Sequence, residues 1–345
     1  DEHSMHLMRA EVPGPQVGKL VPRIKNTAMI LYGLYIVLTI IEILLLLLGG
    51  MSFFDSVVNS FATAGTGGFS IRNASIAAYD SVYAEIVMTV FMALFGINFN
   101  LMFFLAIGRF KDAIKSEELR VYIGIIAAAT ILITLNILPL YDSFGQALRY
   151  SSFQVSSVIT TTGFITANYE LWPQFSQIIL LIVMFIGACA GSTGGGLKIS
   201  RIIIMVKSML REIMGLSHRR LIKNVRFEGK TVDEEVVRGV NTYFTIYCIL
   251  FILFVLVVSL DGFDFKTTVS SVITCINNVG PGLGIVGPVG NFSRFSGFNK
   301  LVLSLAMLTG RLEIFPIIML FTPSVWKGLI KVNRQHNSNN KTNMI

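Results

Sequence analysis

The chain has 345 residues, of which 53% are hydrophobic and only 14% are charged. A soluble domain carries about 25% charged residues, so this composition favours a membrane protein. The net charge of +8 would suggest nucleic-acid binding in a soluble protein. Here the cations lie in a few polar connectors, where the positive-inside rule explains them more simply.

Six stretches are apolar enough to cross a bilayer, which takes roughly 20 residues. In chain order they cover residues 28–48, 83–108, 121–140, 176–205 (with an interruption), 238–260 and 299–322. Within each consecutive pair of spans, a shorter half-apolar segment ends in a glycine turn. The three glycine turns are TGGF at Thr66–Phe69, TTGF at Thr161–Phe164 and NVGP at Asn278–Pro281. This order predicts three units, each made of a span, a short re-entrant helix, a turn and a second span.

The polar segments divide the chain further. We expect a lead-in at residues 1–27, units at 28–108, 121–206 and 238–325, connectors at 109–120 and 207–237, and a tail at 326–345. Lys and Arg concentrate in the connectors and the tail, so these should face the cytoplasm and the glycine turns should open to the outside. Each short segment begins near an aspartate, at Asp55, Asp142 or Asp264, which we expect to cap the helix.

The glycine turns have the composition of an ion-selective pore. A small cation is dehydrated by a ring of backbone oxygens, and glycine allows the backbone to turn its carbonyls inward. The candidate cation-binding residues are Thr66, Gly67, Gly68, Phe69, Thr161, Thr162, Gly163, Phe164, Asn278, Val279, Gly280 and Pro281. The alternative is a set of ordinary re-entrant turns that only end short helices.

Around these turns the chain resembles the Trk/Ktr/HKT superfamily of potassium transport proteins, and most closely its bacterial Trk type. The resemblance covers essentially the whole chain. Its motifs are AEVPGP (10–15), KLVPRI (19–24), TAGTGGFS (63–70), ITTTGFIT (159–166), GACAGSTGGGLKI (187–199), NNVGPGLG (277–284) and LTGRLEIFP (308–316). Their order and spacing make the match specific.

The resemblance implies an all-α membrane protein whose helix–pore-helix–helix units surround one pore with pseudo-fourfold symmetry. Such proteins have four units, and this sequence contains three, so we expect the first unit to lie upstream. It further implies potassium as the transported ion, with the glycine turns as its binding site, and no covalently bound cofactor. Since one quarter of the filter is not in the sequence, potassium against sodium preference stays open, as does coupling to protons or sodium.

A gate is also implied by the resemblance. The glycine-rich run Cys189–Ser200, with Gly191, Gly194, Gly195 and Gly196, interrupts an apolar helix and would be an intramembrane loop that obstructs the pore. Arg311 would add an electrostatic barrier below the filter. The alternatives are a passive kink for close helix packing and, for Arg311, pairing with Glu313 or a snorkelling anchor. Lys198 could stabilise the loop or mark the cytoplasmic boundary.

The sequence thus predicts a potassium-uptake subunit of the bacterial inner membrane, not an enzyme. The resemblance adds a homodimer and a cytosolic nucleotide-binding regulatory subunit on the basic face, with the lipid bilayer as surroundings and no nucleic acid. An alternating-access carrier would need inverted repeats, whereas these units read in one direction. A membrane enzyme would need a nucleophile–base pair or a metal cluster, and the four histidines lie in polar flanks without metal-ligand spacing.

Overall fold

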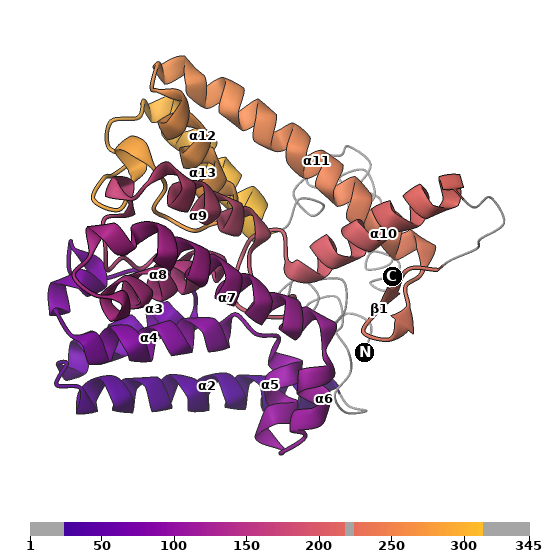
Figure 1. Ribbon diagram of the computed structural model, residues 1–345, viewed down its shortest axis with the longest axis horizontal. Coiled ribbons are helices and arrows are strands. Elements are labelled where there is room, and N and C mark those ends of the chain that lie inside the picture. Colours follow the sequence, from indigo (N-terminus) through magenta and orange to yellow (C-terminus); the bar gives the residue numbers. More distant parts are fainter. Residues whose placement is uncertain (1–23, 218–223, 313–345) are drawn as a thin grey trace, which may run out of the picture.

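The computed structural model describes residues 24–217 and 224–312. The helices form three consecutive groups along the chain, seen as indigo, magenta and orange layers in Figure 1. The groups are α2 (Ile24–Leu48), α3 (Phe53–Ala64) and α4 (Val82–Phe95); α7 (Glu117–Ile137), α8 (Phe144–Ile159) and α9 (Gln174–Ile186); and α11 (Glu234–Val258), α12 (Phe265–Ile276) and α13 (Gly297–Arg311). Every group therefore repeats the same order of long helix, short helix and second helix.

The other elements connect these groups. Helices α5 (Phe99–Ala106) and α6 (Phe110–Lys115) join the first unit to the second, and α10 (Ile199–Ser217) follows α9. Strands β1 (Arg226–Phe227) and β2 (Lys230–Thr231) form an antiparallel hairpin before α11. Short 3₁₀ turns lie at Ser75–Tyr79 (η1), Leu138–Leu140 (η2), Tyr169–Leu171 (η3), Ser259–Asp261 (η4) and Gly284–Val286 (η5).

Long apolar helices with little burial identify the membrane-facing surface. Within the described residues, the stretches Met29–Leu48, Glu117–Leu140 and Glu234–Asp261 are long and apolar enough to cross a bilayer. Only 17%, 33% and 22% of their most apolar windows is buried within the protein. Because exposed apolar surface on this scale is unfavourable in water, these helices are suited to contact lipid tails.

The short helices show the opposite pattern. In α3, polar residues such as Asn59 and Ser60 are fully buried, whereas Phe54 and Phe61 are exposed. Helices α8 and α12 also bury several serines and threonines. A polar interior surrounded by apolar surface is the arrangement expected when helices line a hydrated path through a membrane.

The caps of the short helices differ from the expectation in two units. Asp264 does accept a hydrogen bond from the Thr267 amide at the start of α12. In the other two units the cap is a serine: Ser52 accepts from the Asp55 amide, and Ser143 accepts from the Gln146 amide. Ser and Asp are about equally good N-caps, so the nearby aspartates did not identify the capping residue.

The expected span at residues 83–108 consists of two helices with a break between them. The chain bends by 108° between α4 and α5. Asn98 causes the break, because its side-chain oxygen accepts the Asn100 amide at 2.9 Å and starts a new helix. Asn98 therefore acts as the N-cap of α5.

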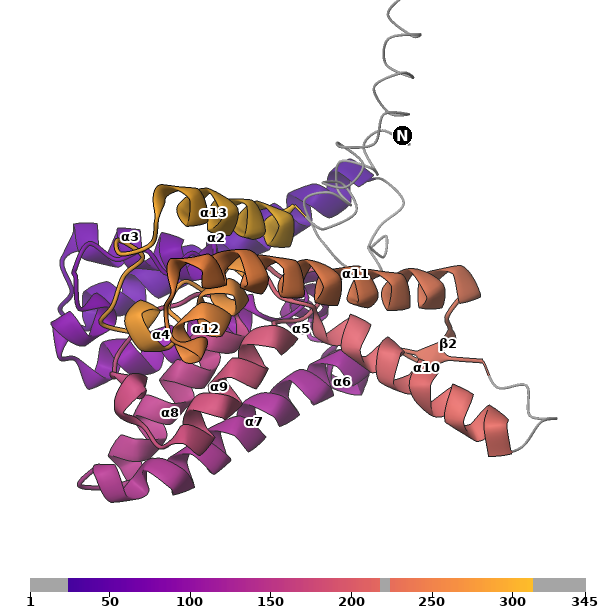
Figure 2. The same cartoon turned by 90° about the horizontal axis from the view of Figure 1, so that it is seen from above.

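A non-helical segment, Gly187–Lys198, separates α9 from α10, and we call it the Gly-rich loop. Figure 2 shows α10 and the first half of α11 extending away from the three groups, with the hairpin beside them. The hairpin is anchored in the second unit, because Val225, Phe227 and Val232 are buried in its apolar cluster. The Gly-rich loop thus connects α9 of the second unit to α10 in this projecting part of the protein.

Candidate functional site

The three glycine turns have the same backbone geometry although their sequences differ. Each starts with a residue in the left-handed region, namely Thr66 (φ +50°), Thr161 (φ +57°) and Asn278 (φ +57°). The amide of that residue donates to the carbonyl three residues earlier, at 3.0–3.1 Å. The next amide donates to the carbonyl five residues earlier, at 2.8–2.9 Å. A left-handed residue with such bonds is a common way to end a helix. Here it gives all three turns the same backbone path after their short helix.

Glycine occupies the third position of every turn, and the backbone requires it. Gly68, Gly163 and Gly280 have φ values of +63°, +85° and +104°. A Cβ on Gly68 would lie 1.8 Å from the Thr162 oxygen, and one on Gly163 would lie 2.0 Å from the Val279 oxygen. Both obstructing atoms are carbonyls of the following unit's turn, so the three turns meet at one place. Gly280 has no atom within 4 Å of its Cβ position.

Most of the candidate cation-binding residues that have a side chain bury it, but the two phenylalanines differ from each other in exposure. Thr66, Thr161, Thr162 and Val279 are each at most 4% exposed. Phe164 is fully buried in the apolar cluster of the first unit, whereas Phe69 is 80% exposed. The two phenylalanines therefore occupy the same position in their turns, but their side chains lie in different surroundings.

Hydroxyl groups hold the outer side of two turns. The Ser157 hydroxyl donates to the Phe164 carbonyl at 2.7 Å, and the Thr274 hydroxyl donates to the Pro281 carbonyl at 3.3 Å. Both donors lie in the last turn of their short helix, α8 or α12. These bonds fix the last carbonyl of the second and third turns to the short helix before it.

The Gly-rich loop lies against the C-terminal ends of all three short helices. Thr66 donates its hydroxyl to the Thr193 carbonyl at 2.9 Å, and Thr161 accepts the Gly195 amide at 2.7 Å. A Cβ on Gly195 would lie 2.6 Å from the Asn277 oxygen, which belongs to the third unit. Glycine at this position is therefore required for close approach to the turns.

Arg311 reaches the same loop from the third unit. Its Nη1 donates to the Thr193 carbonyl at 3.1 Å. The Thr193 oxygen thus accepts from Thr66 and from Arg311, residues of the first and third units. Glu313, the alternative partner of Arg311, lies outside the described residues, as do the lead-in motifs and the tail.

Lys198 folds back into the loop. It is 1% exposed, adopts φ +74°, and its ammonium donates to the Gly194 carbonyl. Of the two roles considered for it, stabilisation of the loop is the one that this contact favours.

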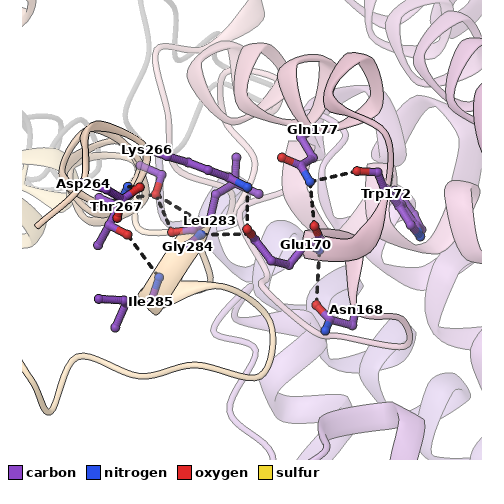
Figure 3. Close-up of polar contacts among 11 residues, drawn as sticks. Asn168, Glu170, Trp172, Gln177, Asp264, Lys266, Thr267, Leu283, Gly284 and Ile285 are labelled. Atoms are coloured by element: carbon purple, nitrogen blue, oxygen red, sulfur yellow. Dashed lines mark hydrogen bonds and ion pairs between the residues drawn. The ribbon is translucent and has the colours of Figure 1, made fainter.

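A second polar cluster ties the second unit to the third (Figure 3). Glu170 in η3 forms an ion pair with Lys266 and accepts the Gly284 amide at 2.9 Å. Gln177 donates to the main-chain carbonyls of Glu170 and Trp172 at 2.7 and 2.9 Å. Nearby, the Thr267 hydroxyl holds the pKa of the Asp264 carboxyl below its ordinary value. The segments that leave the turns at Gly163 and Gly280 are thereby fixed to each other.

Sequence reasoning did not identify several of these residues. Thr193 and Glu170 make their contacts across 118 and 114 residues of chain, counting the bonds to Arg311 and Gly284. Glu118 was missed as well: its carboxylate accepts the amide of Ala190 in the Gly-rich loop, 72 residues away. Only the position of Thr193 within the glycine-rich run offered a signal. The carboxylates look like ordinary solvated charges in the sequence.

Comparison with known proteins agrees with this architecture. Residues 1–327 match the TrkH family, described as a cation transport protein. The Trk system potassium uptake protein TrkH of Salmonella typhimurium is 38% identical over 327 residues, covering 94% of this chain and 67% of that protein. TrkG of Escherichia coli K12, another Trk system potassium uptake protein, is 35% identical over 93% of this chain and 67% of its own length.

A solved structure is similar as well. The crystal structure of the potassium transporter TrkH from Vibrio parahaemolyticus superposes with a TM-score of 0.83 at 34% identity, over 94% of this chain and 69% of that one. The two relatives and the Vibrio parahaemolyticus protein are all named as potassium uptake or transport proteins, and none of the three is named as an enzyme. The chain belongs to the TrkH family of cation transport proteins.

Proposed function

We propose that this protein takes up potassium across the bacterial inner membrane through a channel-like pore. The observation that carries the proposal is the meeting of three glycine turns with the same backbone geometry, in which the Gly68 and Gly163 positions lie against a carbonyl of the next turn. The choice of potassium as the transported ion rests on the relatives, which are named as Trk system potassium uptake proteins.

In this proposal the carbonyl oxygens of the glycine turns replace the water around a potassium ion. Backbone oxygens are neutral, so they can bind a cation without holding it too tightly to leave. The short helices support this role, because their C-terminal ends point at the turns and the helix dipole makes that end negative. Thr66–Phe69, Thr161–Phe164 and Asn278–Pro281 are the proposed filter residues.

We propose that the Gly-rich loop and Arg311 form the gate. The loop contacts the inner ends of the turns through Thr66 and Thr161, so it occupies the position where an ion would leave the filter. Arg311 places a positive charge next to that position, which raises the energy of a cation there. Movement of the loop away from the turns would remove both obstacles, because the Arg311 side chain is bonded to the loop.

The basic connector supports two further proposals, a cytoplasmic location and docking of a nucleotide-binding regulatory subunit. Described cations of the connector and its flanks are Lys207, Arg211, Arg226, Lys230 and Arg238. Arg219, Arg220 and Lys223 lie outside the described residues. We also propose a homodimer, which follows from family resemblance; cross-linking of the native protein in membranes tests it.

Growth rescue tests the proposed function. The native gene for this chain is expressed in a bacterium that lacks its own potassium uptake systems, on medium with low potassium. Restored growth, together with potassium accumulation in the cells, is the expected result. Expression in the membrane without growth or accumulation would contradict the proposal.

A further inference from the structure

Glu118 joins both ends of the Gly-rich loop. It lies in the first turn of α7 and is only 4% exposed. Its Oε1 accepts the Ala190 amide at 2.7 Å and the Ser200 amide at 3.2 Å. Ala190 belongs to the Gly-rich loop, and Ser200 lies in the first turn of α10 directly after it. One carboxylate oxygen therefore fixes the distance between the two arms of the loop.

The contact with Ser200 is also a helix cap. The first four amides of a helix have no partner within it, and a carboxylate at this end is stabilised by the helix dipole. Glu118 of α7 thus supplies a hydrogen-bond acceptor to the first turn of α10. If this carboxylate moves, the loop and the beginning of α10 lose a common anchor.

A second carboxylate holds the first. Glu228 Oε1 accepts the Ser116 hydroxyl at 2.7 Å and the Glu118 amide at 3.0 Å. Glu228 lies at the tip of the hairpin between β1 and β2, so a surface turn of the connector caps α7. The path from the hairpin to the loop consists of two carboxylates and four hydrogen bonds.

The backbone of the hairpin suggests that Glu228 is present for its side chain. Glu228 has φ +52° and Gly229 has φ +74°. A two-residue hairpin with both residues in the left-handed region is a type I′ turn, in which Asn-Gly is the favoured sequence. Glutamate is a strained occupant there, and strain that persists points to a role in function.

The rest of the hairpin is fixed to the same helices. Val225 and Phe227 are buried in the cluster that contains Leu119 of α7 and Ile203 of α10. Lys207 of α10 contacts the carboxylate of Glu117 at 2.5 Å and donates to the Arg226 carbonyl at 2.8 Å. The hairpin therefore packs against α7 and α10 as one unit. This unit is adjacent to the Gly-rich loop, because α10 follows the loop directly.

We infer that Glu118 is a positioning residue for the Gly-rich loop, and that Glu228 couples this clamp to the hairpin. Displacement of the hairpin withdraws Glu228 from the start of α7, loosens Glu118 and frees both arms of the loop. A partner that binds at the hairpin can thereby control the loop without contacting the pore. This inference rests on the proposed role of the loop as a gate.

Hydrogen–deuterium exchange of the native protein in lipid nanodiscs tests the clamp directly. In Glu118→Ala, two buried amides lose a charged acceptor, so peptides that cover residues 187–200 should exchange at least about tenfold faster. Glu118→Gln keeps an oxygen acceptor without the charge and should fall between wild type and Glu118→Ala. The Gln variant keeps the test valid if the Ala variant does not fold.

Glu228→Asn tests the coupling. Asparagine suits the type I′ turn, so peptides of the hairpin should keep their wild-type exchange. Its side chain is too short to reach Ser116 and Glu118 from the same backbone position, and the 187–200 peptides should therefore exchange faster. Glu117→Gln is the matched control: Glu117 is the neighbouring carboxylate and contacts Lys207 instead of the loop, and glutamine keeps an oxygen that accepts from the Lys207 ammonium, so the contact between α7 and α10 is retained. It should leave the 187–200 peptides as in wild type.

Potassium flux measured on the same variants separates this inference from the proposed function. Faster loop exchange together with higher flux in Glu118→Ala and Glu228→Asn supports both. Faster exchange with unchanged flux keeps the clamp and contradicts the loop as a gate. Wild-type exchange of residues 187–200 in both Glu118→Ala and Glu228→Asn, or an equal effect of Glu117→Gln, overturns the clamp, whatever the flux.

Discussion

Arg311 Nη1 donates a hydrogen bond to the Thr193 carbonyl at 3.1 Å. This bond connects the last turn of α13 to the Gly-rich loop of the second unit, and the same oxygen accepts the Thr66 hydroxyl of the first unit at 2.9 Å. The loop is thus held by side chains from outside its own unit. Any change that weakens these bonds is expected to alter the loop before it alters the fold.

Replacing Arg311 by alanine should increase potassium flux. The change removes a positive charge beside the ion path and one of the two donors to Thr193, so both the barrier and the hold on the loop weaken. The measurement is rubidium uptake into proteoliposomes. Arg311→Lys, which keeps the charge, should give flux between wild type and alanine, and Arg294→Ala on the exposed loop before α13 should not change it. Wild-type flux in Arg311→Ala would exclude the barrier role.

Serine at Gly163 should reduce potassium selectivity. A Cβ there would lie 2.0 Å from the Val279 oxygen, and the left-handed backbone is unfavourable for a residue with a side chain. The neighbouring carbonyl must therefore shift. The ratio of potassium to sodium permeability in planar bilayers measures the effect.

Gly145→Ser is the control for this prediction. Gly145 lies in the same helix–turn segment, but its Cβ position has no atom within 4 Å. Selectivity should match wild type. If Gly163→Ser also keeps the wild-type permeability ratio, the turn does not contribute to selectivity.

Deleting Gly194–Gly196 should raise potassium flux. The deletion removes the Gly195 amide from Thr161 and the Gly194 carbonyl from Lys198, and so withdraws the loop from the turns. Flux at saturating potassium is the measurement, with protein amount in the membrane as the reference. A deletion variant with the flux of wild type would leave the loop as a passive kink between α9 and α10.

Glu170 and Lys266 should differ in their effect on stability. Glu170→Ala leaves the Gly284 amide without its acceptor, so it should lower the free energy of unfolding by about 1–3 kcal/mol. Lys266→Ala removes only a partly exposed ion pair, which is worth about 1 kcal/mol or less. Thermal unfolding in detergent compares the two. Equal losses would show that the amide contact adds nothing to the ion pair.

The glycine turns could be found from the sequence because their requirement is local. A left-handed backbone and the absence of room for a Cβ both select glycine, and so Gly68, Gly163 and Gly280 are visible as a repeated pattern. The short helices before them follow from the half-apolar composition, although Ser52 and Ser143 cap two of them in place of the expected aspartates.

Other features depend on contacts that the sequence does not reveal. The break at Asn98 was missed because a single capping residue interrupted an otherwise apolar stretch. The contacts of Arg311 with Thr193 and of Glu118 with Ala190 join segments 118 and 72 residues apart. Pairings at such distances are set by how the units pack, and no local pattern in the chain predicts them.

The most direct test is the position of the transported ion in a crystal of the native protein soaked in thallium, a heavy substitute for potassium. Anomalous scattering then locates the ion. The account predicts a peak at the meeting point of the three glycine turns, in contact with the Thr162 and Val279 carbonyl oxygens. A bound ion elsewhere in the pore, with none at the turns at a thallium concentration that supports transport, would contradict it.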